Sequence, residues 1–300
     1  MSKPALYFFI GKGGVGKSTT SALTAVHLAT AGRRTLLVSM DPAHNQRDIF
    51  DMSFTEKPRR VAPDLAVKEI DADYWTARYL KQTRDQIRRT YTYQSAFNLQ
   101  DHFKILQFSP GLEEYALLLA FESVVHGGDD QDAIVFDMAP TALSLRFFSL
   151  PTVTLVWLNE LLKLRSAICE KKEIISKIKI GRKSIETDRV KEKLNTLIEN
   201  HTHLKAHFMA AGTHIHLVMN NDRLSFSEAL RIRKRLADIP VDIARVVVNK
   251  VGPGETTADI RTAFPRLPIS TLPLVPGGIL GLSALRQFVS EHSEAFEDLY

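Results

Sequence analysis

The feature that most constrains this chain is a glycine-rich run that reads Gly11-Lys12-Gly13-Gly14-Val15-Gly16-Lys17-Ser18. An apolar run over residues 6–10 comes directly before it, and a helical pattern over residues 19–31 follows. Strand, glycine loop and helix in this order are the context in which a G-x-x-x-x-G-K-[ST] sequence binds phosphate. A plain strand-to-helix turn without a ligand is the alternative, and the complete motif disfavours it. The chain is therefore predicted to bind a nucleotide.

The residue types of this loop match the chemistry of phosphate binding. Glycines let backbone N–H groups turn toward phosphate oxygens, and the following helix N-terminus adds a fixed positive end. Lys17 is expected to neutralise the β- and γ-phosphates, and the Ser18 hydroxyl is expected to ligate Mg²⁺. Lys12 is a second lysine at a position where the general motif accepts any residue. A solvated loop lysine is the alternative interpretation of Lys12, and the surrounding motif disfavours it.

The composition limits the class of protein. Three hundred residues with 44% apolar content suffice for one large α/β domain or for a domain with an inserted lobe. Cys169 is the only cysteine, which excludes an intramolecular disulfide and a site built from several thiolates. The first four residues form no secretory leader, and no uninterrupted apolar run reaches membrane-spanning length. These features predict a cytoplasmic protein.

Short apolar runs alternate with helical patterns along the chain. This alternation predicts a mostly parallel, doubly wound α/β sheet with helices on both faces. The expected strands cover residues 6–10, 35–39, 65–70, 105–108, 133–137, 215–219, 245–249 and 269–272. The expected helices cover residues 19–31, 111–125, 226–237 and 283–297.

Two gaps are longer than a single crossover helix needs. Within one domain over residues 1–300, residues 71–103 are predicted to form a helical insertion and residues 155–211 an inserted helical lobe. The lobe is expected to hold two amphipathic helices broken near Gly181, and its central part is rich in lysine and arginine. Its apolar faces either pack on the domain or stay partly open to receive a client or partner.

Two predicted strands lead to carboxylates. Asp41 follows one strand in the run Asp41-Pro42-Ala43-His44-Asn45, and Asp137 ends another. Ligands of open α/β sheets bind at the carboxyl ends of strands, so both carboxylates are expected near the γ-phosphate and its metal. His44 is a possible general base, but we favour a structural or switch role for it.

These motifs together resemble those of the arsenical-pump and tail-anchored-protein targeting ATPases. The motifs that carry the resemblance are K-G-G-V-G-K-S, D-P-A-H-N, D-x-A-P-T at residues 137–141, Val248-Asn249-Lys250 and Leu272-Pro273-Leu274-Val275-Pro276. The resemblance implies a P-loop NTPase fold and ATP hydrolysis with Mg²⁺. It also implies a homodimer in which Lys12 reaches the partner's nucleotide, where a cation would stabilise the transferring phosphoryl group.

The resemblance further implies a role for each matching residue. The catalytic residues are Lys12, Lys17 and Asp41, and Asp41 orients the attacking water. The metal shell is formed by Ser18, Asp41 and Asp137. Asn249 contacts adenine near Pro273, and Asn45 supports the loop of Asp41. The full set expected to bind ATP is Gly11, Gly13, Gly14, Val15, Gly16, Lys17, Ser18, Thr19, Asn45, Asn249 and Pro273.

Three functions stay open at this point. The leading hypothesis is a homodimeric ATPase whose nucleotide state controls a hydrophobic client or a membrane-protein partner through residues 155–211. The alternatives are a partitioning ATPase of the Min or Par type that acts on membrane or DNA, and a binding module that uses ATP as a latch. Nucleic acid is not the expected partner. Ala142-Leu143-Ser144 replaces the family's usual Gly-His-Thr, which leaves the second switch open.

Overall fold

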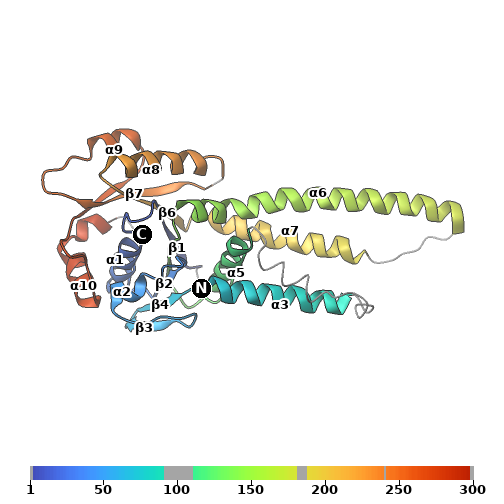
Figure 1. Ribbon diagram of the computed structural model, residues 1–300, viewed down its shortest axis with the longest axis horizontal. Coiled ribbons are helices and arrows are strands. Elements are labelled where there is room, and N and C mark those ends of the chain that lie inside the picture. Colours follow the sequence, from blue (N-terminus) through green and yellow to red (C-terminus); the bar gives the residue numbers. More distant parts are fainter. Residues whose placement is uncertain (1–2, 91–110, 181–187, 240, 298–300) are drawn as a thin grey trace. The chain divides into compact units, whose positions relative to one another are not determined.

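The computed structural model describes residues 3–90, 111–180, 188–239 and 241–297 (Figure 1). The chain divides into two compact units, which are treated separately below. The sheet unit comprises Met1–Phe147 and Ala211–Tyr300, and the hairpin unit comprises Phe148–Ala210. The strand expected at residues 105–108 lies outside the described residues, as does the second part of the expected insertion at residues 71–103.

The sheet unit is built on one eight-stranded sheet in the order β3-β4-β2-β5-β1-β6-β7-β8. Its strands are β1 (Ala5–Ile10), β2 (Thr35–Ser39), β3 (Arg59–Ala62), β4 (Leu65–Glu69), β5 (Ala133–Asp137), β6 (Thr213–Asn220), β7 (Ile243–Val251) and β8 (Ile269–Pro273). All neighbouring strands are parallel except β3, which pairs antiparallel with β4 and exposes Arg59 and Arg60. The predicted mostly parallel α/β fold is confirmed.

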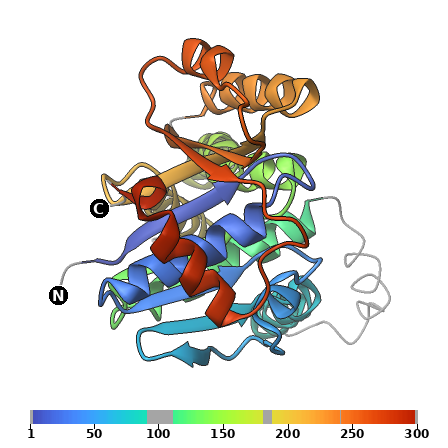
Figure 2. The ribbon, with the colours of Figure 1, turned by 90° about the vertical axis from the view of Figure 1, so that its left-hand side faces the viewer.

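Helices flank this sheet on both faces. The helices of the unit are α1 (Lys17–Thr30), α2 (Gln46–Phe50), α3 (Ala72–Thr90), α5 (Leu112–His126), α8 (Arg223–Leu236), α9 (Ala258–Ala263), α10 (Leu282–Glu291) and the 3-10 helix η2 (Ser293–Phe296). Figure 2 shows α1 and α10 on the same side of the sheet. The helix expected over residues 283–297 is split, because His292 has non-helical backbone angles.

The central strand β1 is buried on both faces, as parallel strands covered by helices require. On one face, Tyr7 and Phe9 belong to a core cluster with side chains of α1 and α10. On the other face, the ring of Phe8 stacks on Phe136 of β5 at a centroid distance of 4.8 Å, and Phe121 of α5 packs against both. The alternation of side chains along β1 therefore joins the two layers of helices.

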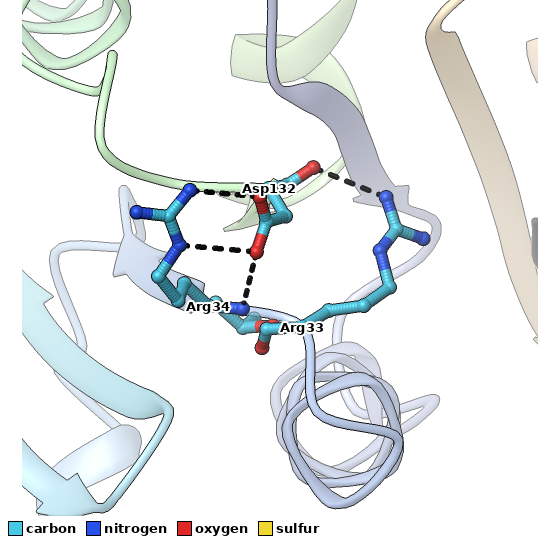
Figure 3. A network of polar contacts seen from close by, with 4 residues as sticks. Arg33, Arg34 and Asp132 are labelled. Carbon is cyan, nitrogen blue, oxygen red and sulfur yellow. Dashed lines mark hydrogen bonds and ion pairs between the residues drawn. The ribbon is translucent and has the colours of Figure 1, made fainter. Parts of the chain in front are cut away.

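A polar network of Arg33, Arg34 and Asp132 lies at the amino ends of β2 and β5 (Figure 3). The Arg34 guanidinium makes two hydrogen bonds to the Asp132 carboxylate, at 3.0 and 3.2 Å, and the Arg34 backbone N–H makes a third. Arg33 donates to the backbone carbonyl of Asp132 and to the hydroxyl of Tyr7. These contacts join β2, β5 and β1 at the end of the strands that lies opposite the glycine loop.

The hairpin unit consists of most of α6 (Thr141–Ile180) together with α7 (Arg189–Phe208). The two helices run antiparallel, because Phe148 near the start of α6 packs on Phe208 at the end of α7. Further along α6, Arg165 pairs with Asp188, whose carboxylate also caps α7. The helix α6 ends at Ile180, next to the break expected near Gly181.

One part of α6 is unusually apolar. The segment Thr141–Lys171 is long and apolar enough to cross a membrane by length and composition, and only 33% of its most apolar stretch is buried. Core helices of soluble proteins pass the same test, so this is weak evidence for a membrane span. The single cysteine, Cys169, is half-buried and donates its thiol to Asp188.

Candidate functional site

The glycine loop, residues 11–16, joins β1 to α1, and its backbone requires glycine at two places. A Cβ at Gly11 would lie 2.2 Å from the carbonyl oxygen of Val218, so any side chain there would collide with β6. Gly16 has a φ of 92°, in the left-handed region, and a Cβ there would lie 2.2 Å from the side-chain amide of Asn249. The loop is therefore tightly enclosed by the ends of β6 and β7.

The helix α1 starts without a side-chain cap. Gly16 occupies its N-cap position, and no side chain there accepts a hydrogen bond from the first turn. The first N–H groups of a helix lack partners within the helix, and the helix dipole adds partial positive charge at the same end. This end of α1 can therefore bind an anion such as a phosphate group.

Lys17 and Ser18, the first two residues of α1, are both buried. Burial lowers the pKa of Lys17, and the nearby carboxylates of Asp137 and Asp41 act in the opposite direction. The fold thus brings together one ammonium group from the start of α1, the carboxylate at the end of β5 and the carboxylate that follows β2. All three charged residues are among those that the sequence predicts at the site, together with Lys12.

Asp137 is the last residue of β5 and is completely buried. Burial raises its pKa to about 6, while hydrogen bonds from Gln46 and Ser18 and the charge of Lys17 lower it. The Nε2 of Gln46 donates to Asp137 Oδ2 at 2.9 Å. Asp137 Oδ1 is buried and has no hydrogen-bond partner in the described part of the chain.

The loop of residues 41–45 leads from the end of β2 into α2. Asp41 is buried, and its Oδ1 accepts a hydrogen bond from the backbone N–H of Ala43 at 3.0 Å. His44 has a φ of 50°, and its Nδ1 lies 3.9 Å from Glu69 Oε2. The amide of Asn45 is 3.5 Å from the Ser18 hydroxyl, which places this loop beside the first turn of α1.

The end of β7 supports the glycine loop from the other side. The Nδ2 of Asn249 donates to the carbonyl of Val15 at 2.8 Å, and the Nζ of Lys250 donates to the carbonyl of Gly14 at 3.0 Å. Two consecutive carbonyls of the loop are thus held by two consecutive side chains. Pro273 ends β8 and pairs in register with Val251.

The oxygen atoms near the first turn of α1 fit a magnesium ion. Mg²⁺ prefers oxygen ligands and is usually bound by one or two carboxylates together with phosphate oxygens and water. Ser18 and Asp137 supply such atoms, and the unpartnered Oδ1 of Asp137 is a buried oxygen that a cation would satisfy. Among the described residues, no group of three or more histidine, cysteine, aspartate or glutamate side chains forms a protein-only metal site.

The remaining predicted residues lie on the glycine loop and in the first turn of α1. Lys12 and Gly13 are exposed on the loop, while Val15 is buried. Thr19 lies in the first turn of α1. Two residues that contact the site were not predicted as site residues: Gln46, which touches Asp137, and Lys250, which touches the loop. Gln46 directly follows the D-P-A-H-N motif, and Lys250 is the last residue of the quoted Val248-Asn249-Lys250 motif, so both motifs carry a signal that could have found them.

Several known ATPases are similar to this chain in sequence. An arsenical pump-driving ATPase of Acidiphilium multivorum is 28% identical over 314 residues, which cover 97% of this chain and 50% of that protein. An ATPase ASNA1 homolog of Entamoeba dispar is 28% identical over 263 residues, covering 84% of this chain and 78% of that protein. A protein of Aquifex aeolicus assigned provisionally as arsenical pump-driving ATPase 2 is 28% identical over 249 residues, covering 83% and 80%.

A family match also spans nearly the whole chain. The sequence profile described as "Anion-transporting ATPase" matches residues 5–291, which include every motif discussed above, the whole hairpin unit and most of the sheet unit. The chain therefore belongs to the anion-transporting ATPase family and is an ATPase.

Proposed function

We propose that this chain hydrolyses Mg²⁺-bound ATP as a homodimer, and that its nucleotide state controls the binding of an apolar helix of a client or membrane-protein partner. One observation carries the catalytic part of the proposal. The uncapped start of α1, the buried Lys17 and the carboxylates of Asp41 and Asp137 converge at the carboxyl ends of the strands. Ligands of parallel α/β sheets bind at this end of the strands.

The phosphate groups of ATP are held by the loop of residues 11–16 and the first turn of α1. Lys17 neutralises charge on the β- and γ-phosphates. Ser18 and Asp137, with Asp41 nearby, hold Mg²⁺, which when bound offsets negative charge on the phosphate oxygens. Asn249 supports the loop through the carbonyl of Val15. Its side-chain oxygen is proposed to accept a hydrogen bond from adenine, near Pro273.

Hydrolysis of ATP needs little covalent chemistry from the protein, because positioning and charge stabilisation supply most of the rate. Asp41 is proposed to orient the attacking water. Its Oδ1 is already engaged by the N–H of Ala43, so Oδ2 is the oxygen left for water. Asn45 keeps the loop of Asp41 close to Ser18.

The homodimer is proposed because of Lys12. This lysine is exposed on the loop, whereas Lys17 at the start of α1 is buried beside the carboxylates. An exposed lysine next to a phosphate site suits a second protomer, where it would meet the charge of the transferring phosphoryl group.

The partner surface is proposed on α6. An exposed apolar stripe runs along this helix, and its members are Val153, Val156, Trp157, Leu161, Leu164 and Ile168. The steps from Trp157 through Leu161 and Leu164 to Ile168 are four, three and four residues, so these side chains lie on one helical face. Such a face suits an apolar partner helix. The stripe contains no methionine, which favours a defined partner over a wide range of clients.

The cytoplasm is the proposed location, since the site uses ATP and the chain relies on no disulfide. A binding module that uses ATP as a latch would share this site but would turn over slowly. Measuring the effect of Asp41 on turnover separates the two functions.

Asp41→Asn should lower kcat for ATP hydrolysis by about 100-fold or more while ATP still binds, because the amide keeps the bond to Ala43 but polarises water poorly. The checks are steady-state phosphate release and calorimetric ATP binding. A variant that turns over like the wild type would contradict the role of Asp41. A wild-type rate near zero would favour the latch.

Lys12→Ala should be inactive alone but active when mixed with Asp41→Asn. Random assortment makes half of the dimers mixed, and one of their two sites then has both residues, so the rate should recover to about a quarter of the wild-type rate. The measurement is phosphate release from a 1:1 mixture, with the mass in solution followed in parallel. A mixture that stays inactive, although both variants bind ATP and form dimers, would place Lys12 in its own site.

Asn249→Ala should weaken the binding of inorganic tripolyphosphate about fivefold, as expected for one lost hydrogen bond that supports the loop. The affinity for ATP should fall more than the affinity for tripolyphosphate, because only ATP carries the adenine that Asn249 is proposed to contact. Titration calorimetry of both ligands tests this. Equal losses would remove the adenine contact, and an unchanged affinity for tripolyphosphate would remove the support of the loop.

The double change Trp157→Glu and Leu161→Glu should abolish capture of a leucine-rich, 20-residue transmembrane peptide while ATP hydrolysis persists. Leu224→Glu is the matched control, since Leu224 is similarly exposed but lies on α8. The measurement is fluorescence anisotropy of the labelled peptide with ATP or ADP present. Equal peptide binding by the stripe variant and the control would contradict a docking role for α6.

A further inference from the structure

We infer that Gln46 is a positioning residue that fixes the carboxylate of Asp137 for Mg²⁺ and ties it to the loop of residues 41–45. The inference rests on the proposed function, because it requires Asp137 to hold the metal. It adds a residue that no sequence motif discussed above assigns to the site.

Gln46 is the first residue of α2 and has no exposed surface. Its Nε2 lies 2.9 Å from Asp137 Oδ2, 3.0 Å from the backbone carbonyl of Ser18 and 3.2 Å from the hydroxyl of Ser21. One amide nitrogen therefore touches both the end of β5 and the first turn of α1. These are the two elements that bring the proposed metal ligands together.

The contact between Gln46 and Asp137 involves only one of the two carboxylate oxygens. The Gln46 amide has two protons, and the Ser21 hydroxyl already donates its own proton to the Ser18 carbonyl. The contact with Gln46 occupies Asp137 Oδ2. Oδ1 is buried and without a hydrogen-bond partner in the ranges described, so it is the oxygen left for Mg²⁺ or a metal-bound water.

A purely structural role explains Gln46 poorly. Its side-chain oxygen, Oε1, is buried and unpaired among the described residues, so the amide is only half satisfied. A buried polar atom without a partner costs stability, and an apolar residue of the same shape would avoid this cost. Its neighbours in α2, Ile49 and Phe50, are buried and apolar. A function that orients Asp137 explains why a glutamine stands at this position despite the destabilising effect of its unpaired Oε1.

The same contact links two parts of the proposed mechanism. Gln46 directly follows the loop that carries Asp41, and the preceding residue, Asn45, approaches the Ser18 hydroxyl. A shift of this loop would therefore move the donor that holds Asp137. Residues that orient metal ligands commonly change metal affinity when they are replaced.

Gln46→Met tests the inference, because methionine has a similar shape but no donor. With ADP as ligand, the variant should bind about tenfold more weakly than the wild type in Mg²⁺, as expected for loss of a residue that orients a metal ligand. In EDTA the two proteins should bind ADP equally. The melting temperature only checks that the variant folds, because loss of the unpaired Oε1 and loss of the donor to Asp137 Oδ2 act on stability in opposite directions. Gln46→Glu should weaken ADP binding in Mg²⁺ further than Gln46→Met does, because it places a second carboxylate next to Asp137.

Titration calorimetry in Mg²⁺ and in EDTA gives the decisive comparison, with Gln287→Met on the exposed face of α10 as the matched control. Equal losses in Mg²⁺ and in EDTA would show that Gln46 supports only the fold of the loop, and unchanged binding in both would show no role; either result overturns the inference. If Asp137→Asn loses the gain in ADP affinity that Mg²⁺ gives over EDTA, and Gln46→Met keeps this gain, only the inference about Gln46 is contradicted. If the wild type binds ADP equally with and without Mg²⁺, the proposed function falls as well.

Discussion

The site depends on a helix that begins without a side-chain cap. A serine or aspartate at the N-cap of α1 would satisfy the first N–H groups and would occupy the space that a phosphate needs. Gly16 prevents this, and the amide of Asn249 fills the space where a Cβ would lie. The strand β7 thus keeps the loop in its open shape, although it is more than two hundred residues away in the chain. The fold and the anion site share one steric requirement.

The buried charges at this site are unequal. Lys17 lies near two carboxylates, Asp41 and Asp137, and all three are largely removed from solvent. Buried charges are costly unless they are paired, and one ammonium group cannot balance two ionised carboxylates. Burial indeed raises the pKa of Asp137 toward the neutral form. A divalent cation would restore the balance, and the arriving triphosphate would then meet a site that is no longer negative.

The parts of the fold that the sequence predicts are those with strong local signals. Strands β1, β2 and β5 are continuous apolar runs, and the loop motif identifies Lys17 and Ser18 directly. The edge strand β3 was missed because its four residues begin with two arginines and show no apolar run. The contact of Gln46 with Asp137 was also missed, since it joins residues that are 91 positions apart and depends on how α2 packs. Patterns within a short window cannot show such a contact.

The edges of the sheet have a consequence for how two copies of this chain can associate. At one edge β3 reverses direction and exposes Arg59 and Arg60, and at the other edge β8 ends at Pro273, which has no N–H to donate. Charged side chains and proline at edge strands oppose the addition of a further strand. Growth into a continuous intermolecular sheet is thereby disfavoured. In the proposed homodimer, association is left to the loops and helices, whose contacts can change with the bound nucleotide without disturbing the hydrogen bonds of the sheet.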